Sequence, residues 1–220
     1  YIELEKINEN SISNIEIYNV QNLDEESSNN EPVLAPSISH HIFDINKRYN
    51  FNYDIKLKAH SIYNDESYDI KRWSGTSNIN KKIFYENFLL EADANLGLDL
   101  YSIQGRPSTD NNNNKYIDRI SSGLSIGASN QFGMSTDSAS LLIQPQIQLS
   151  SILATDRTEE VPNRDSSEFI LDQANLFLNN QYQGRDNLQK QDRLNLGITS
   201  LLMSENIGNI DFFLGQSQKL

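Results

Sequence analysis

Hydrophobic and polar residues alternate along much of this chain, and the clearest example is the stretch 88–100. Its apolar phase consists of Phe88, Leu90, Ala92, Ala94, Leu96, Leu98 and Leu100. Its other phase is mostly polar and consists of Glu91, Asp93, Asn95, Gly97 and Asp99. A period of two places successive side chains on opposite faces of a β-strand. The stretch therefore predicts a strand with one apolar face and one polar face.

The same period recurs in other stretches, which polar connections separate. These stretches are 1–7, 11–20, 37–44, 49–60, 71–79, 119–129, 139–153 and 193–203. Turns are expected at 8–10, 46–48, 80–82 and 131–138, and polar loops at 21–32, 61–70 and 104–116. The pattern predicts an all-β, antiparallel fold of roughly ten strands. Pro145 lies inside one stretch, where a proline normally marks an edge or a bulge.

The length of the stretch 88–100 favours a membrane-spanning strand. Strands of globular proteins have a modal length of about 5–6 residues, whereas a tilted strand needs about 9–11 residues to cross a bilayer. Aromatic residues flank both ends, with Phe84 and Tyr85 on one side and Tyr101 on the other. Such positions suit the aromatic girdles of a transmembrane β-barrel, although aromatic residues in a soluble core would give the same spacing.

Composition excludes some classes of function and leaves others open. The net charge of −12 disfavours a nucleic-acid partner, which would require a basic face. The chain has no cysteine, so disulfides, thiol nucleophiles and cysteine-based zinc sites are not expected. The mean hydropathy of −0.59 does not exclude a barrel, because the strands of a barrel alternate apolar and polar residues.

No motif of the chain predicts catalysis or metal binding. Asp165 and Glu168 could be read as paired carboxylates, but catalysis needs them to converge in a dry pocket. The series Asp110, Asn112 and Asn114 imitates the start of a calcium loop without its glycine and final glutamate. Adjacent histidines such as His40 and His41 point to opposite faces of a strand and cannot chelate one metal ion. We therefore expect no enzymatic activity, metal or cofactor.

The stretch 159–200 is a long polar connection that runs into the last of these strands. Its apolar residues are Phe169, Ile170, Leu171, Leu176, Phe177 and Leu178. Connections beyond about 12–15 residues are usually functional or disordered, and a solvated linker needs no apolar cluster. We therefore expect 159–186 to form an ordered, plug-like or lid-like loop. Phe169, Leu176 and Phe177 would anchor it, and Gly184 would supply a tight turn.

Short motifs of this connection carry a family resemblance. They are Val161-Pro162-Asn163-Arg164-Asp165-Ser166, Asp172 with Asn175-Leu176-Phe177, and Asn180-Gln181-Tyr182-Gln183-Gly184-Arg185-Asp186. In this order they resemble the long barrel loop of the LptD (OstA, organic-solvent-tolerance) family of lipopolysaccharide-assembly proteins. The run IQPQIQL at 143–149 resembles a strand of the same family. Gln181 and Asn187 replace arginines of the family pattern, and Tyr182 replaces a phenylalanine.

The resemblance implies a fold, a function and partners. Residues 1–220 would be part of the C-terminal transmembrane β-barrel domain, without the periplasmic domain that precedes it in the family. The barrel would move lipopolysaccharide (LPS) from a periplasmic bridge to the outer leaflet of the outer membrane of a Gram-negative cell. The implied partners are LPS, an LptE-like plug lipoprotein, an LptA-like bridge protein and outer-membrane lipid. The chain begins at Tyr1 and ends just after an alternating run, so we expect an internal piece of a larger barrel.

Two sets of candidate functional residues follow. The residues of the loop motifs are Pro162, Asp165, Asn175, Leu176, Phe177, Gly184 and Asp186. The residues expected to line the lumen are Glu91, Asp93, Asn95, Asp99, Gln144, Gln146 and Gln148. Two alternatives stay open at this point: another outer-membrane barrel such as a porin or receptor, and a soluble β-rich binding module whose apolar phase forms a core.

Overall fold

The computed structural model describes residues 1–19, 33–63, 69–104, 114–163 and 165–220. The acidic stretch 21–32 and the calcium-like residues Asp110 and Asn112 lie outside the described residues. The strands are β1 (Ile2–Asn8), β2 (Ser11–Asn19), β3 (Val33–Asn46), β4 (Phe51–Tyr63), β5 (Asp69–Tyr85), β6 (Phe88–Gln104), β7 (Lys115–Asn130), β8 (Phe132–Ser135), β9 (Ala139–Ala154), β10 (Ser167–Glu168), β11 (Tyr182–Gln183), β12 (Asp192–Ser204) and β13 (Gly208–Lys219). One short 3₁₀-helix, η2, spans Asp156–Glu160.

The described strands form one large antiparallel sheet and one small hairpin. The 11-stranded sheet has the order β1-β2-β3-β4-β5-β6-β7-β9-β12-β13, and β8 pairs with β9 beside this path. The hairpin consists of β10 and β11. The prediction of an all-β antiparallel fold is confirmed. The sheet is open, because no pairing among the described residues joins β1 to β13.

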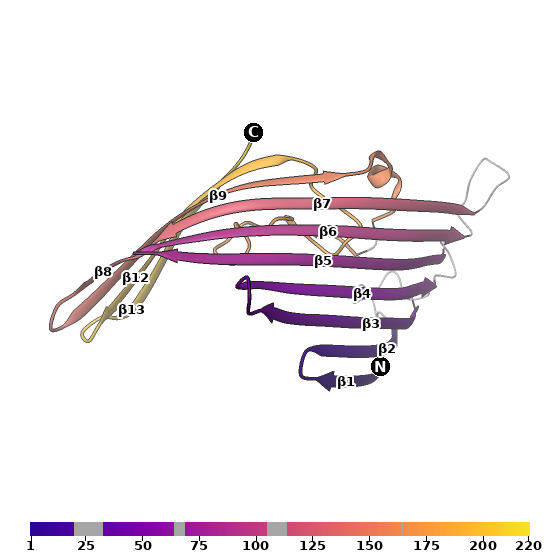
Figure 1. Cartoon of the computed structure of the whole chain (residues 1–220), viewed down its shortest axis with the longest axis horizontal. Helices are drawn as coiled ribbons and strands as arrows, with labels where there is room; N and C mark the ends of the chain where they lie inside the picture. Colours follow the sequence, from indigo (N-terminus) through magenta and orange to yellow (C-terminus); the bar gives the residue numbers. More distant parts are fainter. Residues whose placement is uncertain (20–32, 64–68, 105–113, 164) are drawn as a thin grey trace, which may run out of the picture.

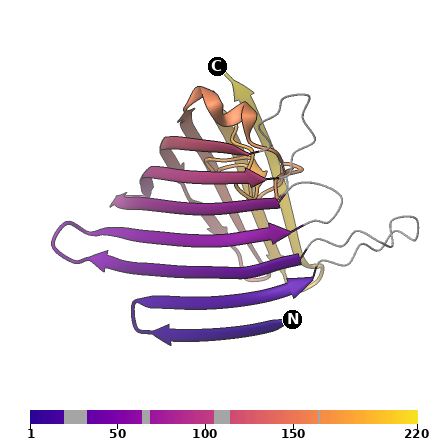
Figure 2. The same ribbon diagram turned by 90° about the vertical axis from the view of Figure 1, so that its right-hand side faces the viewer.

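The sheet is strongly curved, and one long connection lies within the curve. Figure 1 shows β9, β12 and β13 turning across the ends of β5, β6 and β7. The connection from β9 to β12 comprises residues 155–191, and its described residues, 155–163 and 165–191, lie in the hollow of the sheet (Figure 2). We call this connection the 155–191 segment. The face that it contacts is the inner face, and the opposite face is the outer face.

The predicted turn at 80–82 is wrong, because β5 continues through these residues to Tyr85. The polar side chains of Asn80 and Lys82 lie on the inner face of the strand, and Lys81 is paired with Ala92 of the outer face. Asn80 Nδ2 donates across the strand pair to Glu91 Oε1 at 2.7 Å and to Asp93 Oδ1 at 2.6 Å. The chain turns instead at Glu86, whose φ is 52°.

The predicted irregularity at Pro145 is confirmed, and the predicted turn at 131–138 is wrong in part. The pairing of β7 with β9 ends at the pair Ser129 and Gln146. The pairing of β8 with β9 starts at the pair Phe132 and Ile143. Pro145 thus lies where neither β7 nor β8 pairs with β9, so its missing N–H costs no hydrogen bond on that side. Residues 132–135 of the predicted turn form β8.

Exposure in this sheet is the reverse of that in a soluble protein. Charged and polar residues of the inner face are buried, among them Arg72, Asp99, Arg119, Asn195 and Arg193. The outer face carries the large exposed apolar residues, including Leu98, Leu100, Leu124 and Ile126. An exposed apolar face much larger than the few hundred Å² usual for soluble monomers marks a surface that meets lipid or a partner. No helix among the described residues is long and apolar enough to cross a membrane.

Candidate functional site

The 155–191 segment contacts strands from both sides of the curved sheet. Its residue Asp186 reaches β5 and β6, where Tyr101 Oη donates to Asp186 Oδ1 at 3.1 Å. Its residue Gln181 reaches β13, where its Nε2 donates to Ser217 Oγ at 3.2 Å. One connection therefore ties together strands that are far apart in the order of the sheet.

Charged side chains of the sheet and the segment form one cluster, which we call the arginine–aspartate cluster. Its members are Arg72, Asp99 and Arg119 from the sheet and Asp165, Arg185 and Asp186 from the segment. Arg72 Nη2 lies 2.6 Å from Asp165 Oδ2, and Arg72 Nη1 lies 2.6 Å from Asp186 Oδ1. Asp99 accepts from Arg119 Nη2 at 2.7 Å and from Arg185 Nε at 2.8 Å. Cations and anions are equal in number, so the cluster carries no net charge.

Arg119 is the central residue of this cluster. Its side chain is 0% exposed. Besides binding Asp99, its Nη1 donates to the carbonyl oxygen of Asp186 at 2.6 Å, and its Nη2 donates to the carbonyl oxygen of Arg185. The planar fork of an arginine directs five N–H donors to separate acceptors, whereas the donors of a lysine all lie on one nitrogen. Arg119 thus fixes both the acid of the sheet and the backbone of the segment.

A tight turn at Gly184 places the segment's two acids beside Arg72. Gly184 has φ of +82°, in the left-handed region that favours glycine. The N–H groups of Arg185 and Asp186 each donate to Asp165 Oδ1 at 2.9 Å. In return, Asp186 Oδ2 accepts from the N–H of Asp165 at 3.0 Å. Asp165 and Asp186 therefore hold each other in position beside Arg72.

Replacing Gly184 by alanine should release this part of the segment from the sheet. A Cβ at Gly184 would lie 2.1 Å from the carbonyl oxygen of Asp165, which is backbone and cannot rotate away. Gly208 is a matched control, because it has φ of +87° and nothing within 4 Å of a Cβ. Gly208→Ala should cost only the backbone strain, about 1–2 kcal/mol. We expect protease to cut the segment in Gly184→Ala and not in Gly208→Ala. Equal resistance would contradict the packed turn.

The pKa of Asp165 predicts how docking of the segment depends on pH. Burial opposes ionisation of this carboxyl group, but the hydrogen bond and charge of Arg72 outweigh burial and hold its pKa well below its usual range. A carboxyl group whose pKa is lowered in the folded state stabilises that state. Its contribution is fully present above the unfolded-state pKa of about 3.9. Its contribution falls as the pH drops from there through the lower folded-state pKa.

The contribution of Asp165 to docking should therefore be constant from neutral pH to about pH 4 and should fall only in stronger acid. Protease resistance of the segment, measured after brief exposure to each pH with an acid-stable protease, tests this. Asp165→Asn should weaken docking at neutral pH and remove much of the acid dependence. Loss of docking already between pH 7 and pH 5 would show that another group controls it.

Apolar residues anchor the segment in a niche that two glycines leave open. Gly197 of β12 and Gly215 of β13 are directly paired. A Cβ at Gly215 would lie 2.5 Å from Leu176 Cδ2, and a Cβ at Gly197 would lie 2.8 Å from Phe177 Cζ. Leu176 is 1% exposed. The missing side chains of the strands thus make room for the Leu-Phe pair of the segment.

Polar residues of β9 and β12 bind the backbone beside this niche. Gln148 Nε2 donates to the carbonyl oxygen of Phe177 at 2.9 Å. Arg193 Nη2 donates to the carbonyl oxygen of Leu178 at 3.1 Å and also to that of Asn179. Arg193 is 1% exposed, so this arginine is buried against carbonyl oxygens. Gln148 and Arg193 thus hold the backbone of the segment beside the niche, and Gln148 Oε1 also accepts from Asn195 Nδ2.

Comparison with known protein families agrees with the motifs of the segment. The family model described as LptD, LPS transport system D, matches residues 2–220. The chain belongs to the LptD family. This confirms the resemblance drawn from the sequence, and the family is one of outer-membrane transport and assembly proteins rather than enzymes. A comparison with curated proteins gave no match.

The LptD-like motif residues gather at the contacts of the segment. Asp165, Gly184 and Asp186 form the turn at Arg72, and Leu176 and Phe177 fill the glycine niche. Asn175 caps the turn before them, because its Oδ1 accepts from the N–H of Asp172 and its Nδ2 donates to the carbonyl oxygen of Ile170. Pro162 is half-buried and makes no polar side-chain contact. Of the apolar cluster, Ile170 is 91% exposed and anchors nothing.

The residues expected to line a lumen all lie on the inner face. Their strand pairings place them there, since Glu91, Asp93, Asn95 and Asp99 share a phase in β6, and Gln144, Gln146 and Gln148 share one in β9. The segment covers Asp99 and Gln148, which are buried. Glu91 and Asp93 stay half-exposed. The inner face is therefore divided into a covered part and an open part.

Sequence reasoning missed the arginines that hold the segment. Arg72, Arg119 and Arg193 each occupy the polar phase of a strand, where an arginine reads as an ordinary hydrated residue. Two of these sites could have been noticed in the sequence. Ile70 precedes Arg72, and Ile117 precedes Arg119, by two residues on the same face, and apolar neighbours on a polar face indicate that the face is covered there. Gln181, which replaces a family arginine, binds Ser217 without any charge.

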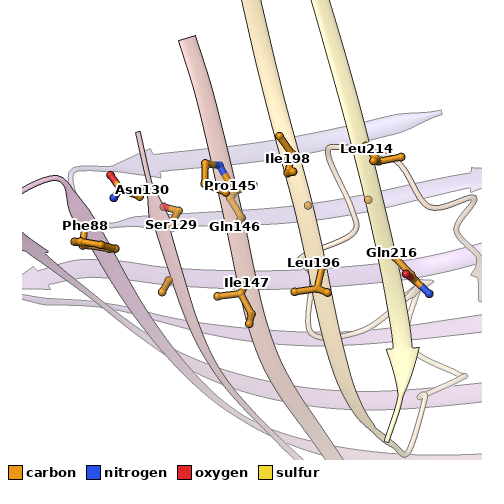
Figure 3. A pocket seen from close by; sticks show the side chains of 13 residues that line it. Phe88, Ser129, Asn130, Pro145, Gln146, Ile147, Leu196, Ile198, Leu214 and Gln216 are labelled. Atoms are coloured by element: carbon orange, nitrogen blue, oxygen red, sulfur yellow. The ribbon is translucent and has the colours of Figure 1, made fainter. Parts of the chain in front are cut away.

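The outer face carries an apolar hollow opposite the segment. Its volume is about 720 Å³, and its side chains include Phe88, Pro145, Ile147, Leu196, Ile198 and Leu214 (Figure 3). It lies where β7 stops pairing with β9, so the local break at Pro145 opens the surface. The hollow continues the exposed apolar face and has no polar centre.

Proposed function

We propose that this chain forms part of the wall of an outer-membrane β-barrel that moves LPS to the outer leaflet. The observation that carries this proposal is the inverted exposure of the sheet, with arginines and aspartates buried inside and leucines and isoleucines exposed outside. Lipid-facing apolar and lumen-facing polar residues alternate in such barrels. Membership of the LptD family supports LPS as the transported lipid.

The lengths of the connections favour one orientation in the membrane. The connections at one end of the sheet, 9–10, 47–50, 86–87, 136–138 and 205–207, are short. The connections at the other end, 20–32, 64–68, 105–114 and 155–191, are longer. Outer-membrane barrels have short periplasmic turns and longer extracellular loops. In this orientation the 155–191 segment enters the lumen from the cell surface.

Closure of the barrel requires strands beyond those described here. The edge strands β1 and β13 each have one side without a partner among the described strands. Within a membrane such edges must be paired, because lipid offers no hydrogen bonds to the backbone. We propose that further strands of the same protein pair with both edges and that a periplasmic domain precedes the barrel. An LptE-like lipoprotein and an LptA-like bridge would be its partners.

The 155–191 segment is proposed to be a fixed brace rather than a gate. Its removal would expose the three buried arginines of the sheet and a buried aspartate. Release of the segment would also break its ion pairs with Arg72 and Asp99 and empty the niche that Leu176 and Phe177 fill, all in one step. Transport would therefore proceed along the open part of the inner face, with the segment in place.

Delivery of LPS by the full-length protein tests the proposed function. The protein is reconstituted with its periplasmic and lipoprotein partners in vesicles, and LPS that reaches the far leaflet is measured with a membrane-impermeant modifying enzyme. We expect delivery by the wild type and none by vesicles without the protein. A pore that passes small solutes but delivers no LPS would favour a porin or receptor instead.

A further inference from the structure

We infer that the outer face holds a phosphate-bearing lipid of the surrounding bilayer, with one acyl chain in a hollow at Gly75 and the phosphate at Lys71. The inference goes beyond the transport of LPS, and it rests on the proposed function only because the outer face must lie in lipid. The site is on the side of the sheet opposite the 155–191 segment. It lies toward the end of β5 from which the long connections leave.

A second hollow of the outer face, centred on Gly75, has the size and chemistry for an acyl chain. Its volume is about 340 Å³, and its border is mostly apolar, with Ile38, Leu57, Trp73, Leu98 and Leu100 among its side chains. Gly75 is paired with Leu57 and Leu98 and has no side chain to fill the space between them. His40 also borders the hollow, and its Nδ1 already shares a hydrogen bond with Ser13 Oγ at 2.8 Å.

The hollow requires an occupant when the outer face lies in a bilayer. Water is poorly held by an apolar surface, because it needs several polar partners. An empty hollow would leave its lining without van der Waals contacts on one side. The flexible chain of a lipid is the group that the bilayer offers at this depth, so we assign the hollow to an acyl chain.

Aromatic residues mark the level of the lipid headgroups beside this hollow. Trp73 and Tyr116 are each 67% exposed on the outer face, and Tyr63 is 40% exposed. Tryptophan and tyrosine gather at the interface between membrane and water. Lys71 lies among them, because it is two residues from Trp73 on the same face and its partner Ser102 is paired with Tyr116. Two residues of a strand span about 7 Å, so one lipid molecule reaches both Lys71 and the hollow.

Lys71 supplies the positive charge that attracts a phosphate. Its side chain is exposed, and among the described residues it has no ion-pair partner. A lysine at the membrane surface attracts anionic lipid headgroups. The hydroxyl groups of Ser102 and Tyr116, in the same row of the sheet, are further donors for phosphate oxygens. The row therefore offers a cation and two hydroxyl groups at the level of the headgroups.

Two acids of the same face leave this charge available. Asp118 is already paired with Arg157, whose Nη1 lies 2.7 Å from Asp118 Oδ1. Asp69 lies two residues beyond Lys71, on the side away from the hollow. A phosphate that is joined to a chain in the hollow therefore meets Lys71 before it meets Asp69.

Photochemical labelling of the full-length protein in nanodiscs tests the inference. The nanodiscs consist of phosphatidylcholine with a small fraction of phosphatidic acid that carries a diazirine in one acyl chain, and labelled residues are mapped by peptide mass spectrometry. We expect labelling to concentrate on Leu57, Leu98 and their neighbours around the hollow. Unlabelled phosphatidic acid should compete, whereas diacylglycerol, which has the same chains and no phosphate, should not.

Lys71→Ala should reduce labelling at the hollow about fivefold, as expected for the loss of one lysine at an anionic membrane surface. Lys81→Ala is the matched control, because Lys81 is exposed on the same face of the same strand, near its other end. This control should be labelled at the hollow as the wild type is. Equal labelling of the two variants, or equal competition by diacylglycerol, would overturn the phosphate contact and with it the inference.

Gly75→Val tests the hollow itself and covers the case in which Lys71→Ala does not fold. A Cβ at Gly75 would lie 3.4 Å from Leu57 Cδ2, and valine is favoured in strands, so the variant should fold with the hollow filled. Labelling at the hollow should then be lost, and it should persist in Ala92→Val, which adds apolar volume elsewhere on the exposed outer face. Persistent labelling in Gly75→Val would overturn the inference.

Delivery of LPS, measured on the same protein, separates this inference from the proposed function. Delivery by a wild type whose outer face is labelled evenly would refute the lipid site and leave the proposed function standing. Labelling of no residue of the outer face would refute the lipid-facing wall on which both rest.

Discussion

Arg119→Ala should be the most damaging single substitution on the inner face, with a loss of about 3–5 kcal/mol in unfolding free energy. The variant leaves Asp99 buried with Arg185 as its remaining partner, and it leaves the carbonyl oxygens of Arg185 and Asp186 without their donor. Denaturant unfolding of the full-length protein in detergent measures the loss. Protease should also cut the 155–191 segment in this variant.

Arg157→Ala provides the matched control for Arg119. Arg157 also pairs with an aspartate at 2.7 Å, that of Asp118, but its side chain is 42% exposed. Exposed pairs contribute about 0–1 kcal/mol, so this variant should unfold close to the wild type. Arg119→Lys should recover only part of the loss, because a single ammonium cannot reach Asp99 and both carbonyl oxygens. Equal effects of Arg119→Ala and Arg157→Ala would contradict a cluster that is buried under the segment.

Ala94→Arg should cost about 2–4 kcal/mol when the protein folds into lipid vesicles, because it places a charge at the middle of the outer face. Ala94 lies in the centre of β6, and its directly paired neighbours Ile79 and Leu124 are both exposed on the same face. An arginine there could not reach the membrane surface from mid-membrane without distorting the bilayer. Folding efficiency and unfolding in vesicles measure the effect.

Thr199→Arg is the control for the opposite face. Thr199 is half-buried on the inner face, paired with Gln144 and Phe213, and its side chain makes no hydrogen bond to the described residues. A charge that points into a hydrated lumen should cost much less than one that points into lipid. Equal costs at the two positions, or a soluble and folded Ala94→Arg variant, would contradict the assignment of the faces.

The period of two was sufficient to predict the sheet and its two faces. The alternation in 88–100 predicted which residues of β6 share a face. The register of β5, β6 and β7 places the predicted polar residues on the inner face and the predicted apolar residues on the outer face. Errors arose where polarity had two meanings. Asn80 and Lys82 read as a turn because both are polar, but their side chains bind the acids of β6 across the strand pair.

The contacts of the segment could be predicted only in part, because pairing across long sequence distances has no local signal. Leu176, Phe177 and Gly184 were identified from motifs and apolar character. Their partners, Gly197, Gly215 and Arg72, are single residues in strands, and nothing in their own neighbourhoods indicates what packs on them. Apolar character also failed to predict burial in one case, because Ile170 belongs to the apolar cluster of the sequence and is exposed.

Labelling of single cysteines along β6 tests the central claim most directly, and the chain has no cysteine to interfere. Residues 88–104 are replaced one at a time in the full-length protein, labelled with a fluorophore and exposed to quenchers in lipid or in water. We expect the even positions 90–100 to be quenched from lipid and positions 91 and 93 from water, and we expect position 103 to resist labelling, because the segment covers it. Quenching of the even positions from water, or labelling of position 103 as readily as position 91, would contradict a lipid-facing sheet with the 155–191 segment docked inside it.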